Sequence, residues 1–284
     1  MKVVFFGSSR FVTPTLEMLY NNFDLSLVVT TEQNSFDPVP FFCKNNKVDF
    51  ISVRKSADII YRYEIENSMA DIGIVADFGI IIPQRLFKTF PRGLINIHPS
   101  LLPKYRGPSP AQYAILNGET TTGVTIIKLD KYVDHGPVLA QVEEPIHSYD
   151  TSQTLYERLF KIGANLLQKT LLDFDRGKFI LIPQNHEHAT FTKPLTRDDG
   201  YIEIKNFFSG KEFLDRMIRA YYPWPEVWTR AKLSEKEEDT RIVKFVPEKK
   251  IQVEGKLEIP VKDFMNGYPD ADKALKEFIK NFIE

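Results

Sequence analysis

The chain has 284 residues, of which 43% are hydrophobic and 26% charged, and its formal net charge is −1. The length is sufficient to bury one large core or two moderate ones, and the composition is near the globular average, which favours neither a disordered nor a fibrous protein. The balanced charge disfavours a protein that binds nucleic acid over its whole surface, although a local basic patch is compatible with it. The apolar runs are too short to span a membrane and the first residues lack a secretory signal, so we expect a cytoplasmic protein.

In the first 150 residues, short β-rich runs alternate with longer amphipathic or polar stretches, which is typical of βαβ units. Residues 2–7 (KVVFFG) predict a buried strand, followed by a helix with Thr13 as its N-cap and Pro14 at its first position. Further strands are predicted at 25–30, 49–53, 71–76 and 94–98. Right-handed crossovers would join these strands into an open, mostly parallel, Rossmann-like α/β sheet with helices on both faces.

The loop after the first predicted strand, GSSRF, has one glycine where a dinucleotide fingerprint needs three, so NAD and FAD are poorly supported. Two later runs, 123–130 and 137–146, predict a pair of strands joined by KYVDHG. Apolar residues spaced along 151–175 predict one face of a long helix.

From about residue 178 the sequence becomes polar and rich in prolines, and we interpret residues 181–204 as a linker. It would join an N-terminal catalytic domain over 1–180 to a C-terminal domain over 205–284. The second domain combines a helical stretch at 210–221 with short β-rich pieces such as RIVKFV and KLEIPV, and its last fifteen residues could form a helix. We predict a smaller β-rich domain resembling an OB-like barrel.

Cysteine and histidine usage limits metal chemistry. The single cysteine, Cys43, excludes an internal disulfide framework and a cysteine-rich zinc site. Among the five histidines, the one tight pair is His186 and His188 in the sequence NHEH. Because no third ligand at usable spacing accompanies it, we interpret the pair as part of a solvated loop and expect no metal.

The stretch GLINIHPSLLPKYRG, residues 93–107, places two polar side chains where a predicted strand meets a loop broken by proline. Ligands of open α/β sheets bind beyond the carboxyl ends of the strands. Asn96 and His98 share one face of the strand, because strand residues alternate. Asp134 lies in the turn between the two later strands, which can fold over the same edge. We therefore expect an amide, an imidazole and a carboxylate to converge there.

These three groups suit the transfer of an acyl-type group to an amine. An asparagine amide and a protonated imidazole can stabilise the oxyanion of a tetrahedral intermediate, and a nearby carboxylate can accept the proton that the amine loses. Taken alone, an Asn-x-His pair at a strand end is more often structural, and an aspartate in VDHG is a common turn residue. The loop PSLLPKYRGPSP favours a functional site, because ligand contacts concentrate on rigid loops, and this loop carries Lys104 and Arg106.

The segments NIHPSLLPKYRG and GVTIIKLDKYVDHGPVLAQ resemble the folate-dependent N-formyltransferases, which use 10-formyltetrahydrofolate as the formyl donor. The motifs occur in the order and at the spacing typical of that family. The resemblance implies the formyltransferase fold and Asn96, His98 and Asp134 as the catalytic residues, without a metal. It also implies two segments that contact the folate: Phe78, Gly79, Ile80 and Ile81 in one, and Ser100, Leu101, Leu102 and Pro103 in the other.

Within the family, the segments VVFFGSSRFVTPTLEML, VADFGIIIP, ATFTKPLTRDDGYIEI and IRAYYPWPEVW look most like the members that formylate methionyl-tRNA. The similarity covers roughly residues 1–230 and implies initiator methionyl-tRNA as the acceptor. Those members usually carry a basic, glycine-rich loop after the second strand, whereas TTEQNSFDPVP has no lysine or arginine from residue 30 to 40. Phosphate contacts normally need such cations, and residues 205–284 hold only 16 Lys or Arg against 15 Asp or Glu.

Because the basic loop is missing, a second acceptor stays possible, namely a nucleotide-linked amino sugar. A small pocket without a basic loop would suffice to bind it. Glycinamide ribonucleotide, or other formyl chemistry, is the third alternative. A folate-binding or tRNA-binding module without catalysis is disfavoured, because binding alone would not require Asn96, His98 and Asp134 together.

Overall fold

The computed structural model describes residues 1–31, 34, 36–60, 63–234 and 240–282. Part of the predicted loop at 30–40, namely Glu32, Gln33 and Ser35, lies outside the described residues. The chain forms two compact units. The first comprises residues 1–110, 121–145 and 156–192, and the second comprises residues 111–120, 146–155 and 193–284.

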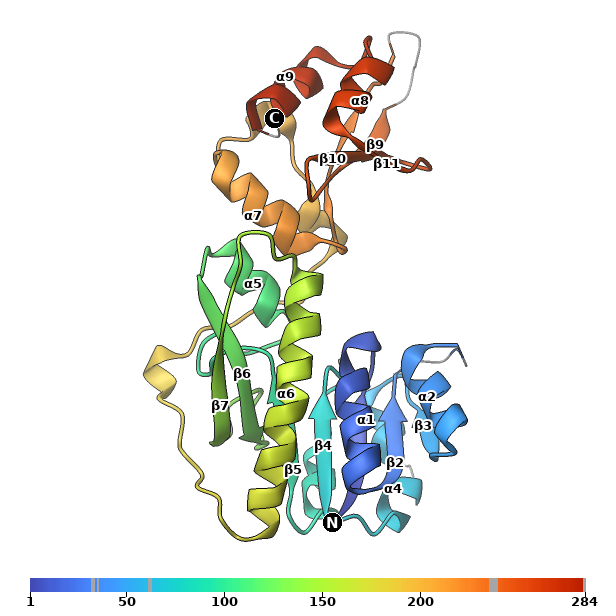
Figure 1. The fold of residues 1–284 in the computed structure, drawn as a ribbon, viewed down its shortest axis with the longest axis vertical. Helices are drawn as coiled ribbons and strands as arrows, with labels where there is room; N and C mark the ends of the chain where they lie inside the picture. Colours follow the sequence, from blue (N-terminus) through green and yellow to red (C-terminus); the bar gives the residue numbers. More distant parts are fainter. Residues whose placement is uncertain (32–33, 35, 61–62, 235–239, 283–284) are drawn as a thin grey trace. The chain divides into compact units, whose positions relative to one another are not determined.

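A seven-stranded sheet forms the centre of the first unit, in the order β3-β2-β1-β4-β5-β6-β7 (Figure 1). Its strands are β1 (Lys2–Gly7), β2 (Asp24–Thr30), β3 (Phe50–Ser52), β4 (Ile72–Ala76), β5 (Leu94–His98), β6 (Thr121–Lys128) and β7 (Val138–Pro145). The pairings among β1 to β5 are parallel, and those of β5 with β6 and of β6 with β7 are antiparallel. The prediction of an open, mostly parallel α/β sheet is confirmed.

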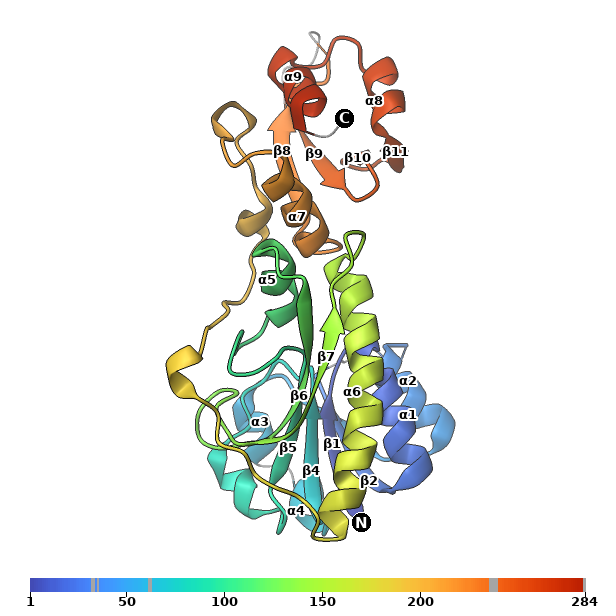
Figure 2. The ribbon, with the colours of Figure 1, turned by 60° about the vertical axis from the view of Figure 1, so that its left-hand side comes forward.

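Helices cover both faces of this sheet, as Figure 2 shows from its edge. They are α1 (Thr13–Asn22), α2 (Pro38–Asn46), α3 (Ser56–Ile60), α4 (Tyr63–Asn67) and α6 (Ser152–Asp175), and α5 (Pro110–Leu116) follows the loop after β5. Strand residues alternate between the two faces, and Val4 and Phe6 of β1 share a core with Ile59 of α3 and Ile65 of α4. Full burial of each such side chain stabilises the fold by about 1.5–3 kcal/mol.

On the opposite face, α1 and α6 lie side by side (Figures 1 and 2). Phe11, just before α1, stacks on Phe160 of α6 with ring centroids 6.3 Å apart. Gly163 of α6 lies so close to the sheet that a methyl group there would press on Ile97 of β5. The long predicted helix therefore packs directly against β5, the strand that carries the candidate site.

The predicted N-cap of the first helix is wrong. A 3-10 turn (Arg10–Val12) runs directly into α1, so Thr13 already has helical backbone angles and Pro14 takes the second position of the helix. The polar cap comes earlier in the chain, because Ser9 Oγ accepts a hydrogen bond from the Phe11 N–H at 3.3 Å. A short turn of this kind has no apolar periodicity that would reveal it in the sequence.

The second unit contains a four-stranded antiparallel sheet in the order β11-β10-β9-β8. Its elements are β8 (Val227–Ala231), β9 (Arg241–Val246), β10 (Lys250–Val253), β11 (Glu258–Pro260), α7 (Lys211–Tyr221), α8 (Val261–Gly267) and α9 (Lys273–Phe282). Phe245 of β9 packs on Phe278 of α9, with ring centroids 5.4 Å apart. The predicted smaller β-rich C-terminal region is confirmed. Within the described ranges, no helix has both the length and the apolar character to cross a membrane.

Candidate active site

Strand β5 brings Asn96 and His98 to the carboxyl edge of the sheet, beside the change from parallel to antiparallel pairing. The turn between β6 and β7 carries Asp134 in a left-handed backbone conformation, with φ 48°. Gly136, two residues on, lies so close to Lys128 that any side chain there would overlap the Lys128 carbonyl oxygen. This close approach folds the turn back against the end of β6.

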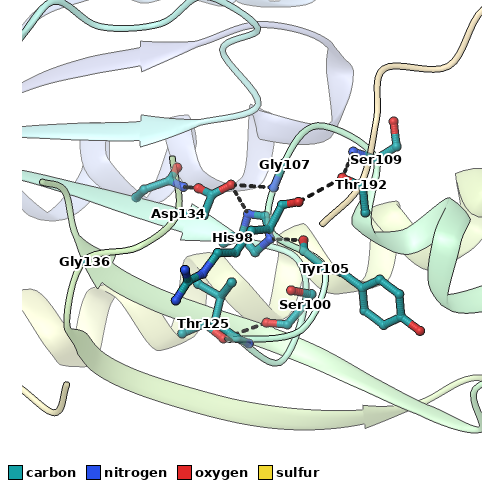
Figure 3. A network of polar contacts seen from close by, with 12 residues as sticks. His98, Ser100, Tyr105, Gly107, Ser109, Thr125, Asp134, Gly136 and Thr192 are labelled. Atoms are coloured by element: carbon teal, nitrogen blue, oxygen red, sulfur yellow. Dashed lines mark hydrogen bonds and ion pairs between the residues drawn. The ribbon is translucent and has the colours of Figure 1, made fainter. Parts of the chain in front are cut away.

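The three predicted groups meet at this edge, and Figure 3 labels two of them, His98 and Asp134. Asn96 Nδ2 donates a hydrogen bond to Asp134 Oδ1 at 3.2 Å, and His98 Nδ1 lies 3.6 Å from Asp134 Oδ2. The Gly107 N–H donates to the same Oδ2 at 2.9 Å. The expected convergence of an amide, an imidazole and a carboxylate is therefore present in the structure, while the catalytic roles of these groups stay a prediction.

The hydrogen bonds of His98 determine which of its nitrogens faces the carboxylate. His98 Nε2 lies 2.9 Å from the carbonyl oxygen of Tyr105 (Figure 3). A carbonyl oxygen can only accept, so Nε2 carries the proton and Nδ1 is the atom turned toward Asp134. His98 is 3% exposed and Asp134 is 9% exposed, so charges here interact more strongly than they would in water.

The segment after α6 forms one wall of this site. The N–H of Tyr105 donates to Thr190 Oγ1 at 2.8 Å, and the N–H of Thr192 donates to the Arg106 carbonyl oxygen at 2.7 Å. Gly107, with φ 109°, lies so close to Thr192 that a methyl group there would press on it. Residues 181–192 of the predicted linker thus make their contacts within the first unit. The domain boundaries at 180 and 204 stay a prediction.

Arg106 points inward, although its loop suggested a ligand contact. It is 3% exposed, and its Nε and Nη2 donate to Gln184 Oε1 at 3.2 Å and 2.6 Å. Burial lowers the pKa of Arg106, and the nearby Asp134 and Asp130 oppose that shift. Nη2 also lies 2.8 Å from His186 Nδ1, and the His186 ring stacks on His135 with centroids 4.0 Å apart. The NHEH segment is exposed, as expected, but His186 belongs to the surroundings of the site.

Comparison with known proteins identifies the family. The sequence profile described as Formyl transferase matches residues 2–171, more than half of the chain. The chain belongs to this family. It is 34% identical to the methionyl-tRNA formyltransferase of Koribacter versatilis (strain Ellin345) in an alignment that covers 94% of this chain and 96% of that protein.

Solved structures share the fold of this formyltransferase. A 4-N formyltransferase from Francisella tularensis superimposes with a TM-score of 0.67 at 20% identity, covering 87% of this chain and 98% of that one. The N-formyltransferase from Helicobacter canadensis, solved with folinic acid and dTDP-3-aminofucose, gives a TM-score of 0.62 at 20% identity, covering 89% and 95%.

The first segment predicted to contact the folate follows β4, the parallel neighbour of β5, and so lies at the same edge of the sheet. Phe78 is 4% exposed and packs edge-on against Phe6 in the core, so it has a structural role whether or not it contacts a ligand. Gly79, with φ 72°, faces open space, Ile80 is half-buried, and Ile81 is 75% exposed. Gly79 and Ile81 are therefore the members of this segment with surface available to a ligand.

The second predicted segment, Ser100 to Pro103, is more enclosed. Ser100 is fully buried, and its carbonyl oxygen accepts from Thr125 Oγ1 at 2.6 Å (Figure 3). The Leu102 N–H donates to the same Thr125 hydroxyl at 3.1 Å, whereas Leu101 and Pro103 are half-buried. The backbone of Ser100 and of Leu102 therefore bonds the loop to β6. Leu101 and Pro103 are partly exposed, so a ligand could contact them. The folate contacts of both segments stay a prediction.

Proposed function

We propose that this formyltransferase transfers the formyl group of 10-formyltetrahydrofolate to the amino group of initiator methionyl-tRNA, a reaction of the cytoplasm. The observation that carries the chemistry is the contact of Asn96 and His98 with one carboxylate, that of Asp134. The similarity to a methionyl-tRNA formyltransferase along nearly the whole chain supports the acceptor. The exposed apolar surface at Gly79 and Ile81 supports the folate donor.

In this proposal, two donors stabilise the oxygen of the formyl group as the amine attacks its carbon. Asn96 Nδ2 carries two hydrogens, so its bond to Asp134 leaves one for the developing oxyanion. His98, when protonated, offers Nδ1–H, because Nε2–H is bound to Tyr105. Each such donor typically contributes about a hundredfold or more to the rate.

The carboxylate of Asp134 accepts the proton that the attacking amine loses, directly or through a water molecule. The bond between the formyl carbon and N10 of the folate then breaks, and N10 gains a proton. One proton thus passes in total from the amine to the folate. The Gly107 N–H, which donates to Asp134, keeps the carboxylate oriented for this transfer.

The acceptor is tested by incubating the protein with 10-formyltetrahydrofolate and, separately, with methionyl-tRNA or a panel of nucleotide-linked amino sugars, following release of tetrahydrofolate. We expect turnover with methionyl-tRNA. Turnover with a sugar alone would replace the proposed acceptor, and the absence of lysine and arginine from residues 30–40 is the observation that favours this second candidate.

The catalytic assignment is tested with His98→Ala, for which we expect kcat to fall by about a hundredfold or more. The exposed His188 provides a matched control, because His188→Ala should retain the wild-type rate. Unchanged turnover in His98→Ala would remove the imidazole from the mechanism.

A further inference from the structure

Gln184 is a buried polar residue that joins two loops of the site. It is 7% exposed. Its Nε2 donates to the carbonyl oxygens of Asp134, at 2.9 Å, and Gly136, at 2.7 Å. Its Oε1 accepts from Nε and Nη2 of Arg106. One side chain from the predicted linker therefore ties the β6–β7 turn to the loop that follows β5.

Both of these connections lead to the Asp134 carboxylate. The bonds to the carbonyl oxygens of Asp134 and Gly136 hold the peptide groups that follow these two residues, and the first of them bears on the left-handed backbone of Asp134. The bond to Arg106 fixes the residue before Gly107, whose N–H donates to Asp134 Oδ2. Gln184 thus contacts the backbone of the residue that carries the carboxylate and the side chain of the residue before its backbone donor.

The distance between Asp134 and His98 makes this placement important. His98 Nδ1 and Asp134 Oδ2 are 3.6 Å apart, which is longer than a hydrogen bond. A small displacement of the turn decides whether these atoms come within hydrogen-bond reach or move further apart. Geometry errors of about 1 Å can cost about a hundredfold in rate.

We propose that Gln184 is a positioning residue of the transfer reaction, whose amide holds the Asp134 carboxylate in place against Asn96 and His98. This inference rests on the proposed function, because it takes Asp134 as the group that accepts the proton. The side chain of Gln184 acts through the backbone of the turn and through Arg106.

An amide is the side chain that meets both requirements. The two carbonyl oxygens need an N–H donor, and the guanidinium of Arg106 needs an acceptor. Gln184→Glu keeps the acceptor for Arg106 but turns an oxygen toward the carbonyl groups of Asp134 and Gly136. Gln184→Met has a similar length and lacks both functions. These two variants separate the donor role of Gln184 from its contact with Arg106.

The experiment measures steady-state kinetics and thermal unfolding for Gln184→Met and Gln184→Glu. Gln168→Met is the matched control, because Gln168 lies on α6 and bonds to Asn22 of α1. For both Gln184 variants we expect kcat to fall by about tenfold to a hundredfold, as for misplaced catalytic groups, with the KM for 10-formyltetrahydrofolate nearly unchanged. The control should keep its wild-type kcat. Gln184→Glu retains the Arg106 contact and supplies the measurement if Gln184→Met does not fold.

A double-mutant cycle distinguishes positioning from a general loss of stability. If Gln184 acts through Asp134, then Gln184→Glu should reduce the single-turnover rate much less in an Asp134→Asn background than in the wild type. Losses that multiply, or a wild-type kcat in both Gln184 variants, would overturn the inference. Failure of the wild-type protein to release tetrahydrofolate with methionyl-tRNA would instead overturn the proposed function, so the two failures can be told apart.

Discussion

Asn96 bonds to Asp134 through one of its two amide hydrogens, and this contact distinguishes its role from that of a simple oxyanion donor. Asn96→Ala should lower kcat by about a hundredfold or more, because a donor to the oxyanion is lost. Asn96→Asp should be worse, because it removes the donor and places a second carboxylate beside Asp134. Steady-state kinetics with both substrates checks this. A loss confined to KM would assign Asn96 to binding.

Gly136 has no room for a side chain, since a methyl group would overlap the Lys128 carbonyl oxygen. In Gly136→Ala the turn must shift, and we expect a destabilisation of about 1–3 kcal/mol, as for overpacked sites, together with loss of activity. Denaturant unfolding and kinetics measure the two effects. Gly267→Ala is the control, because nothing lies within 4 Å of the position where its methyl group would be. Equal behaviour of the two variants would contradict the argument.

Some residues of the site could be predicted from the sequence, and others could not. Asn96 and His98 could be predicted because they alternate at the end of a clear strand, and Asp134 because it lies in a turn between two strands. Gln184 could not, since it lies in an irregular polar segment without periodicity, and its role arises from tertiary contacts. The inward direction of Arg106 was equally hidden, because a loop sequence does not show which side chains are buried.

Among the secondary-structure elements, the strands of the large sheet could be predicted to within about two residues, because buried parallel strands appear as short apolar runs. The long helix α6 begins one residue after its predicted start. The prediction is this close because the apolar spacing extends over all 24 residues of the helix. The short helices α3 and α4 carry too few turns for such a pattern to be detected. The start of α1 was missed because a 3-10 turn extends it at its N-terminus.

The short helix Arg197–Gly200 of the second unit provides a pH-dependent prediction. Hydrogen bonds from the side chain and backbone of Thr196 lower the pKa of Asp199 below its ordinary value of 3.8. A lowered pKa in the folded state stabilises the protein above the unfolded-state pKa, and the stabilisation disappears as the pH falls through the folded-state value. Asp199→Ala should therefore be less stable than the wild type at pH 7, and the difference should close below about pH 4. Chemical unfolding over this range measures it, and a gap that persisted in acid would contradict the capping role.

For the whole molecule, the charge balance governs how a tRNA would bind. The net charge is −1, and residues 30–40 contribute no cation. Binding to tRNA phosphates releases counterions, so kcat/KM for methionyl-tRNA should decline between about 50 and 200 mM salt, with a shallow slope that reflects few phosphate contacts. The KM for 10-formyltetrahydrofolate serves as the internal control and should change little. A kcat/KM for methionyl-tRNA that is independent of salt would argue against an acceptor bound through its phosphates.

The contact between Gln184 and the Asp134 turn also bears on synthesis of the chain. The large sheet is complete at Pro145 and α6 at Asp175, but the residues that close around the site extend to Thr192. A nascent chain that has emerged only as far as the end of α6 therefore still lacks the amide that bonds to the Asp134 turn. Chains that end before Gln184 would contain all seven strands of the large sheet but would lack the side chain that bonds to the Asp134 turn.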